Sequence, residues 1–247
     1  MTTNGTDFQK PSFKQLGSLA GFIVEFLASI LSFEQVAYWL GHKSEFKKKL
    51  LEVFSVEEVF DLWSEEKTKI TNFYRTCFGD KWILNWGEVK FPEVNGNIKR
   101  PEFIFPNMTE QEAFDAYADH FGKDKVWKAW NNITEAIKRE SVQKRPTQNY
   151  IVLHIGGDEP DLLNYSYDDG IAKNIIFLTP LEGIIAAFRY RFETGKMYDV
   201  IRLTRLSALD QDGGAMSMCR GSDSGFHVGS NDRGSRHSDR GLRQASF

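Results

Sequence analysis

Thr179-Pro180-Leu181-Glu182 opens the stretch that decides the fold, and it continues Gly-Ile-Ile-Ala-Ala-Phe-Arg-Tyr-Arg-Phe-Glu-Thr to a glycine at 195. The threonine hydroxyl can cap a helix start, the proline fits the first turn, and the glutamate three residues later can reach back to the cap. A glycine at the end suits the left-handed conformation that closes a helix. The sequence therefore predicts a helix over 179–194. Its inward face has spacings of four, three and four: Leu181, Ile185, Phe188 and Phe192.

The sequence predicts both helices and a strand before this helix. A second capping box begins at Thr109 and predicts a helix ending at Gly122, and residues 127–137 are expected to be helical as well. The run 150–155 is rich in β-branched and apolar residues and ends at two glycines, which predicts a buried strand followed by a tight turn. We expect His154, within it, to be a packed strand residue. The sequence thus predicts an α+β fold.

The N-terminal part of the chain has helical periodicity. Apolar residues recur at threes and fours over 13–31, and cap signals predict further helices over 33–40 and 55–65. We also expect a short helix over 45–51. We expect a helical N-terminal region over residues 1–71.

No segment of this sequence is expected to enter a membrane. The longest apolar stretch, 16–33, carries Glu25 at its centre, whereas a spanning helix needs about 20 predominantly apolar residues. An acidic residue precedes this stretch, which lies late for a signal peptide. We expect a cytoplasmic protein that makes no membrane insertion.

Composition favours a globular protein and excludes several other classes. The 247 residues include 31 Lys and Arg against 34 Asp and Glu, a net charge of −3, so the global basic excess of nucleic-acid binders is missing. Cys77 and Cys219 are too few and too far apart for a disulfide framework, and no histidine stands at ligand spacing. We expect no metal, no cofactor and no catalytic residue.

The composition changes after Lys196. Residues 197–247 contain no Lys and no Glu, and Gly, Ser, Arg and Asp dominate. Apolar residues still recur in the manner of short strands, so we expect 207–247 to be ordered and packed on the rest of the domain. The alternative is a flexible RNA-binding tail of Arg, Gly and Ser residues, with four arginines as contacts. These are Arg233, Arg236, Arg240 and Arg243.

Several segments together resemble a known protein family. They are Leu178–Glu182, Phe188–Asp199, Asp212-Gly213, Phe226–Val228 and Gly241–Ser246. In these segments the chain resembles the variable proteins of diversity-generating retroelements. The resemblance extends from about Tyr74 to the end. It implies a C-type-lectin-like domain of the formylglycine-generating-enzyme type, which we expect over residues 72–247, with a diversified segment at 207–243.

The resemblance also implies what the domain does. In this family a reverse transcriptase copies an RNA template with errors at adenines, AAC codons are the main targets, and the product replaces the 3′ end of the gene. The diversified residues then form a face that binds a macromolecular ligand, which we expect to be a protein. The residues compatible with such codons are Leu209, Asp210, Ser217, Cys219, Arg220, Ser222, Asp223, Ser230, Asn231, Asp232, Ser235, Arg236 and His237. We expect them to be mostly exposed on one contiguous face.

Four residues of the same segment cannot arise from AAC codons. Gln211, Met216, Met218 and Gln244 are therefore expected to belong to the invariant scaffold, with both methionines buried. The formylglycine-generating enzymes use paired cysteines, whereas Cys219 stands alone in its segment. We expect binding without catalysis, and contact with nucleic acid only if the tail is flexible.

Overall fold

A computed structural model describes residues 62–89, 92, 100–157, 159–223 and 225–247. The chain divides into two compact units, Met1–Leu62 and Trp63–Phe247. The expected helices over 13–31, 33–40 and 45–51, and the start of the one over 55–65, lie outside the described residues. Apart from Leu62, all of the described residues belong to the second unit.

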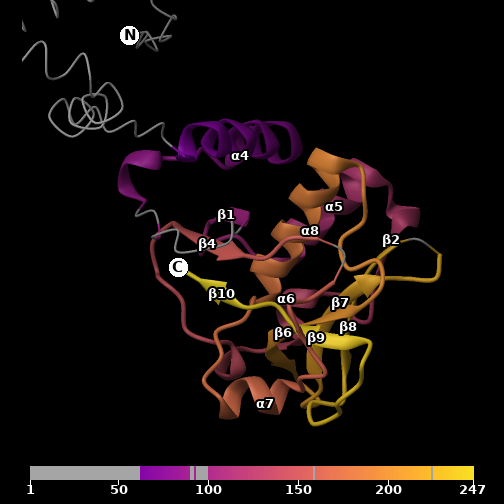
Figure 1. Ribbon diagram of the computed structural model, residues 1–247. Coiled ribbons are helices and arrows are strands. Elements are labelled where there is room, and N and C mark those ends of the chain that lie inside the picture. Colours follow the sequence, from indigo (N-terminus) through magenta and orange to yellow (C-terminus); the bar gives the residue numbers. More distant parts are fainter. Residues whose placement is uncertain (1–61, 90–91, 93–99, 158, 224) are drawn as a thin grey trace, which may run out of the picture. The chain divides into compact units, whose positions relative to one another are not determined.

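The described part of the chain is α+β (Figure 1). Its helices are α4 (Leu62–Phe78), α5 (Glu110–Phe121), α6 (Ile133–Ala136), α7 (Tyr167–Ala172) and α8 (Pro180–Thr194), with short 3₁₀ turns at Gly79–Lys81, Trp86–Glu88, Lys123–Lys125 and Arg139–Ser141. Its strands are β1 (Arg100–Ile104), β2 (Val126–Lys128), β3 (Ile137–Lys138), β4 (Tyr150–His154), β5 (Leu162–Leu163), β6 (Leu203–Asp210), β7 (Ala215–Arg220), β8 (Phe226–Asn231), β9 (Arg240–Leu242) and β10 (Ala245–Ser246). No helix among these is long and apolar enough to cross a membrane.

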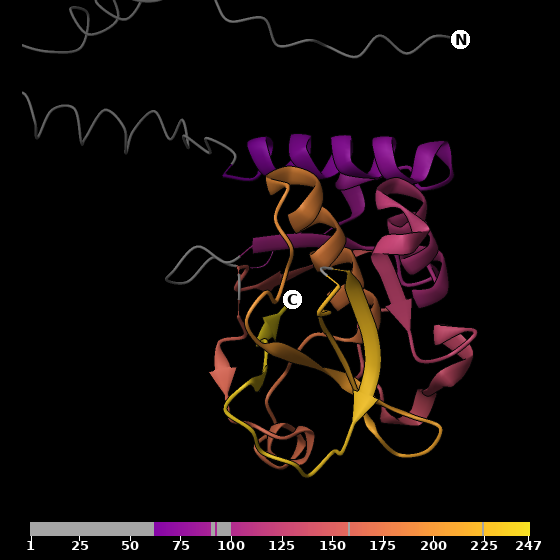
Figure 2. The same cartoon turned by 90° about the vertical axis from the view of Figure 1, so that its right-hand side faces the viewer.

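The strands form two sheets. One has the order β1-β4-β10, and the other has the order β2-β8-β7-β6-β9-β5, with β3 paired to β6. Most pairs are antiparallel, but β2 pairs with β8 and β6 pairs with β9 in parallel. In both views α4 lies at the end of the second unit opposite α7 (Figures 1 and 2).

Helix α8 forms as the sequence predicts. The Thr179 hydroxyl accepts from the Glu182 N–H, the Glu182 carboxylate accepts from the Thr179 N–H, and Gly195 ends the helix with φ of 69°. Leu181, Ile185 and Phe188 are buried and Phe192 packs against the same core. The helix lies very close to the larger sheet, because a Cβ on Gly183 would stand 2.6 Å from a methyl of Leu206.

Two other predicted elements are confirmed and one is wrong. The capping box at Thr109 opens α5, and the buried strand predicted over 150–155 is β4, which ends at His154 with Ile155 exposed. The helix expected over 127–137 is replaced by β2, α6 and β3. Trp127 pairs with a strand about a hundred residues away, and Asn132 caps a new helix by accepting from the N–H groups of Thr134 and Glu135. Long-range pairing here overrides local periodicity.

The second unit begins earlier than expected. Helix α4 continues without a break through residue 71, where we expected the helical region to end. Ile70, Phe73 and Tyr74 are all buried in the core of this unit. The structure therefore places the start of the unit at Trp63 rather than at residue 72.

The C-terminal segment is part of the sheets. Residues 203–246 supply β6 to β10, and Met216 and Met218 are buried as predicted, while Gln211 and Gln244 are exposed. Arg243, which the flexible-tail alternative needs as an RNA contact, is fully buried. The segment is thus built into the fold that α8 supports.

Candidate functional site

The β7–β8 hairpin separates its side chains onto two faces. Residues opposite each other on paired strands share a face, and successive residues alternate. Met218 stands opposite Val228, and both are buried against the core. Cys219 stands opposite His227 on the other side, which we call the outer face. Burial raises the pKa of the Cys219 thiol, which keeps it protonated.

The turn of the hairpin lies at one end of the outer face. Ser222 and Asp223 are exposed there, and Arg220 is exposed at the end of β7, although it stands opposite Phe226 on the inner side of the hairpin. The Asp223 carboxylate accepts from the Gly225 N–H at 2.8 Å and lies 3.0 Å from Nε2 of His227. The backbone N–H and the imidazole together lower the pKa of Asp223.

A loop over residues 232–239 follows the end of β8, at the opposite end of the hairpin from its turn. Arg205 holds this loop by hydrogen bonds. This arginine lies on β6 and is fully buried. Its Nη1 donates to the carbonyl of Asp232 at 3.0 Å, and its Nη2 donates to the carbonyl and the hydroxyl of Ser235, both at 2.9 Å. The carbonyl of Asp239 also accepts from the Leu203 N–H at 2.8 Å. The path of this loop is therefore fixed through its main chain.

Two ion pairs made by exposed arginines connect the same loop to α7. Arg233 lies 2.6 Å from Asp168, and Nε of Arg236 donates to Asp169 at 2.8 Å. The contact with Arg236 is the main reason that the pKa of Asp169 lies well below its usual range. In the pair of Arg233 with Asp168 both side chains are about half exposed, and exposed pairs contribute little to stability.

The predicted site residues separate into three groups. Six are exposed and form the hairpin turn and the loop, and we call them the exposed set: Arg220, Ser222, Asp223, Asp232, Arg236 and His237. Four are half-buried: Cys219, Ser230, Asn231 and Ser235. Three are buried: Leu209, Asp210 and Ser217.

For the buried residues the prediction of exposure is wrong. Leu209 packs in a small core with Tyr167 and Phe177. The Asp210 carboxylate accepts from the N–H groups of residues 212 and 214 and closes the turn between β6 and β7. Ser217 lies beside Arg205 in the strand register. Ser230 stands opposite Met216, so it belongs to the inner side of the hairpin rather than the outer face.

One exposed residue on the outer face was missed from the sequence. Trp127 on β2 is 51% exposed, and its ring centroid lies 5.3 Å from that of His227. Its indole covers Gly229, whose missing Cβ would lie 3.4 Å from the ring. The sequence predicts a helix over 127–137, which gives no reason to place Trp127 beside β8. Only the parallel pairing of β2 with β8 brings Trp127 to this face.

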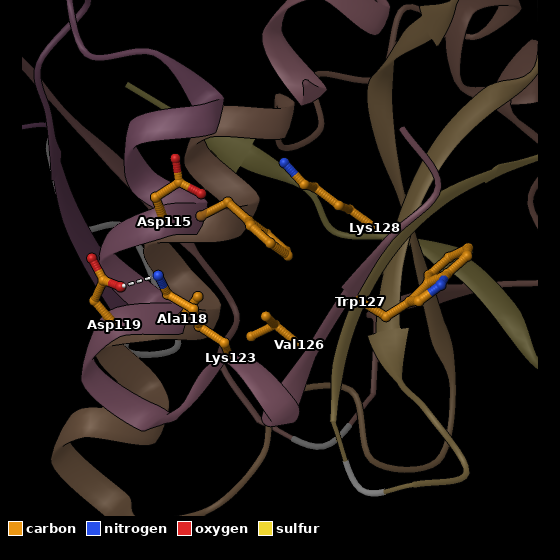
Figure 3. Close-up of a pocket in the computed structure, with 8 residues that line it drawn as sticks. Asp115, Ala118, Asp119, Lys123, Val126, Trp127 and Lys128 are labelled. Atoms are coloured by element: carbon orange, nitrogen blue, oxygen red, sulfur yellow. Dashed lines mark ion pairs between the residues drawn. The ribbon is translucent and has the colours of Figure 1, made fainter. Parts of the chain in front are cut away.

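An open hollow of about 500 Å³ lies on the other side of β2, against α5 (Figure 3). Val126 and Lys128 point toward α5 there, whereas the Trp127 side chain points away. The Lys128 ammonium donates to Gln111 at 2.8 Å, and Lys123 lies 3.5 Å from Asp119. The residues lining it are Phe114, Asp115, Ala118, Asp119, Lys123, Val126, Trp127 and Lys128.

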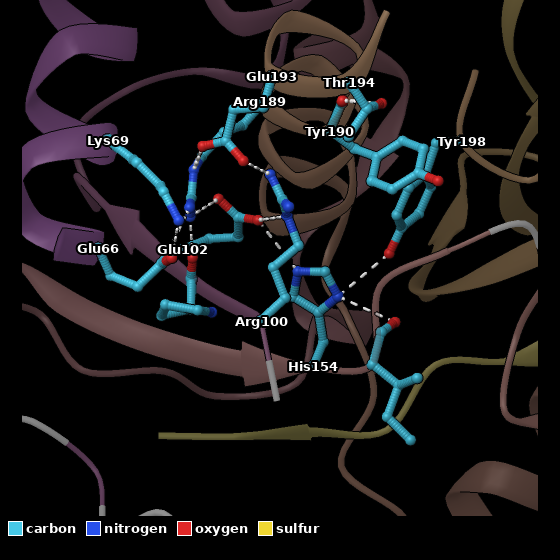
Figure 4. A network of polar contacts seen from close by, with 12 residues as sticks. Glu66, Lys69, Arg100, Glu102, His154, Arg189, Tyr190, Glu193, Thr194 and Tyr198 are labelled. Atoms are coloured by element: carbon cyan, nitrogen blue, oxygen red, sulfur yellow. Dashed lines mark hydrogen bonds and ion pairs between the residues drawn. The ribbon is translucent and has the colours of Figure 1, made fainter. Parts of the chain in front are cut away.

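A buried polar network lies between α8 and the smaller sheet (Figure 4). Glu102 lies 3.2 Å from Nε2 of His154 and 3.0 Å from Nη1 of Arg189, and the Tyr198 hydroxyl lies 3.1 Å from Nδ1 of the same histidine. Burial opposes ionisation of Glu102, but Arg189 and Arg100 outweigh it and lower its pKa to about 2. These side chains are buried, so the network is structural and His154 is a packed strand residue.

No protein-family model, curated protein or solved structure matches this chain. Among the described residues, no group of three or more His, Cys, Asp or Glu side chains could hold a metal ion. The case for a function therefore rests on the geometry of the outer face and its loops.

Proposed function

We propose that this chain is a recognition protein that binds another protein through the outer face of the β7–β8 hairpin, the hairpin turn and the 232–239 loop. We propose further that the domain is C-type-lectin-like and that its exposed set is diversified by a retroelement. The observation that carries the proposal is the contact of Arg205 with the carbonyls of Asp232 and Ser235.

Because Arg205 holds main-chain carbonyls, the path of the 232–239 loop does not depend on which side chains the loop carries. A carbonyl is present whatever residue occupies the position, so a buried arginine fork can hold the main chain of many different sequences. The Leu203 N–H does the same for Asp239. Beneath the hairpin, Met216 and Met218 are buried in the core. Neither residue can arise from a mutated AAC codon, so diversification leaves this part of the core unchanged. Exchange of exposed side chains then changes what is bound and leaves the fold in place.

The exposed set has the chemistry of a protein-binding surface. It presents guanidinium, carboxylate, hydroxyl and imidazole groups, which recognise mixed donors and acceptors on a partner. A nucleic-acid ligand is less well matched, because Arg233 and Arg236 are already paired with the carboxylates of α7 and Arg243 is buried. The balance of charge around the loop thus favours a protein.

A pair of displayed libraries tests the proposal. In the first, the exposed set is replaced by the residues that AAC codons can reach. In the matched control, six exposed positions of α4 are replaced in the same way: Ser64, Glu65, Thr68, Asn72, Arg75 and Thr76. Both full-length libraries are selected against three purified folded proteins, ubiquitin, lysozyme and maltose-binding protein, and against an oligouridine.

We expect most members of the first library to fold and to yield specific binders to the three proteins more often than the α4 library. Surface substitutions usually change stability by less than about 0.5 kcal/mol, so folding should survive. The proposal fails if the first library is mostly unfolded, if the two libraries yield binders equally, or if only the oligouridine is bound.

A further inference from the structure

The outer face has an aromatic residue that does not belong to the diversified segment. Residues 199–247 contain no Tyr and no Trp, so the exposed set of this chain has no large aromatic contact of its own. Trp127 lies on β2, outside 207–243, yet its parallel pairing with β8 brings it beside His227. A residue outside the diversified segment thus stands on the outer face of the hairpin whose turn carries part of the exposed set.

The position of the indole suits contact with a partner. Half of the residue is exposed, and one side of the ring is supported by Gly229 and His227. A supported ring loses little conformational freedom on binding, and tryptophan is enriched among the residues that dominate binding energy. A Cβ on Gly229 would lie 3.4 Å from the indole, at van der Waals contact, so the ring packs directly over the main chain of β8.

The surroundings of Trp127 favour a protein over a nucleic acid. The hollow on the far side of β2 is lined by two carboxylates, Asp115 and Asp119, and by two ammonium groups, Lys123 and Lys128. These charges cancel, so no net positive charge is available there for phosphate groups. A protein that places an apolar side chain against the indole needs no such charge.

We propose that Trp127 is a constant anchor of the binding face, on which a folded protein partner places an apolar side chain while the exposed set decides which protein is bound. This inference rests on the proposed function. It adds that one contact is common to many different partners, because the diversification does not reach it.

The test uses binders taken from the exposed-set library against ubiquitin, lysozyme and maltose-binding protein. In each binder we change Trp127→Ala, and as a control Ile83→Ala, which removes an exposed apolar side chain that is not on the outer face. We expect Trp127→Ala to weaken the dissociation constant about tenfold or more in most binders, as truncation of an energetically dominant residue does. Ile83→Ala should change it less than about twofold.

The melting temperature of each variant shows whether it is folded. If Trp127→Ala does not fold, Trp127→Leu is judged by the same tenfold threshold. The inference is overturned if most binders lose no more affinity than with Ile83→Ala, or if the loss is confined to an oligouridine probe. In the first case binders exist and the proposed function stands. If the library yields no binders at all, the proposed function and the anchor both fail.

Discussion

Glu102 shows how single residues hold this fold together. Its carboxylate is buried and receives Arg189 on one oxygen and His154 on the other. A buried charge is tolerated only when it is paired and hydrogen-bonded, and removal of one partner leaves the other uncompensated. The network in Figure 4 therefore links α8 to the smaller sheet, and removal of any one member leaves a buried polar group without its partner.

We expect Glu102→Gln to lower the free energy of unfolding by about 1.5–3 kcal/mol at pH 7, the usual cost of losing a hydrogen bond to a charged group. The pKa of Glu102 is lowered from 4.5 to about 2 by folding. The contribution of ionised Glu102 to the free energy of unfolding is therefore complete above pH 4.5 and is lost as the pH falls toward 2. Urea denaturation at pH 7, 5, 4 and 3 should show the difference between the two proteins shrinking below pH 4.5. A constant difference would contradict this role.

Among the contacts that hold the 232–239 loop, those of Arg205 matter most, because this side chain binds two of the loop's carbonyls. Arg205→Lys replaces a fork with a single ammonium, which cannot reach both carbonyls in the same geometry. We expect amide hydrogen exchange in 232–240 to become faster by about tenfold, the effect of losing one net hydrogen bond. Arg236→Lys is the control, because it alters only an exposed pair, and exchange should change by less than about twofold. Equal effects of the two variants would mean that Arg205 does not hold the loop.

At the scale of elements, α8 supports both the core and the sheet that bears the outer face. Phe188 is fully buried, with ring centroids of Phe73 and Tyr117 at 4.9 and 5.2 Å. We expect Phe188→Ala to lower the free energy of unfolding by about 3–5 kcal/mol. Exposed Ile83→Ala should change it by less than about 0.5 kcal/mol. Chemical denaturation measures both, and a loss below about 1 kcal/mol for Phe188→Ala would mean that this face of α8 is not the core.

Elements with local signals could be predicted from the sequence, and elements that depend on distant partners could not. The caps at Thr109 and Thr179 and the β-branched run of β4 each carry their own signal. Strand β2 carries none, because three residues become a strand only by pairing with β8. Trp127 was absent from the predicted site for the same reason, because its position depends on the pairing of β2 with β8.

The whole molecule shows why codon compatibility alone overestimates how many residues of this segment are exposed. Leu209, Asp210 and Ser217 have side chains that an AAC codon can produce, but the fold buries them. The second small core and the turn between β6 and β7 were not visible in the sequence, since both need residues brought together from far apart. Composition indicates a candidate segment, and the structure separates the exposed residues of that segment from the buried ones.

The DNA that flanks the gene tests the central claim most directly, because it records which codons change. The account predicts a near-repeat of the 3′ end, beside a reverse transcriptase gene, in which the differences lie at adenines. These differences should fall in codons of the exposed set and spare Leu209, Asp210, Met216 and Met218, which the fold buries. A locus without such a repeat, or one whose differences fall in codons of those buried residues, would contradict a diversified face held on a constant main chain.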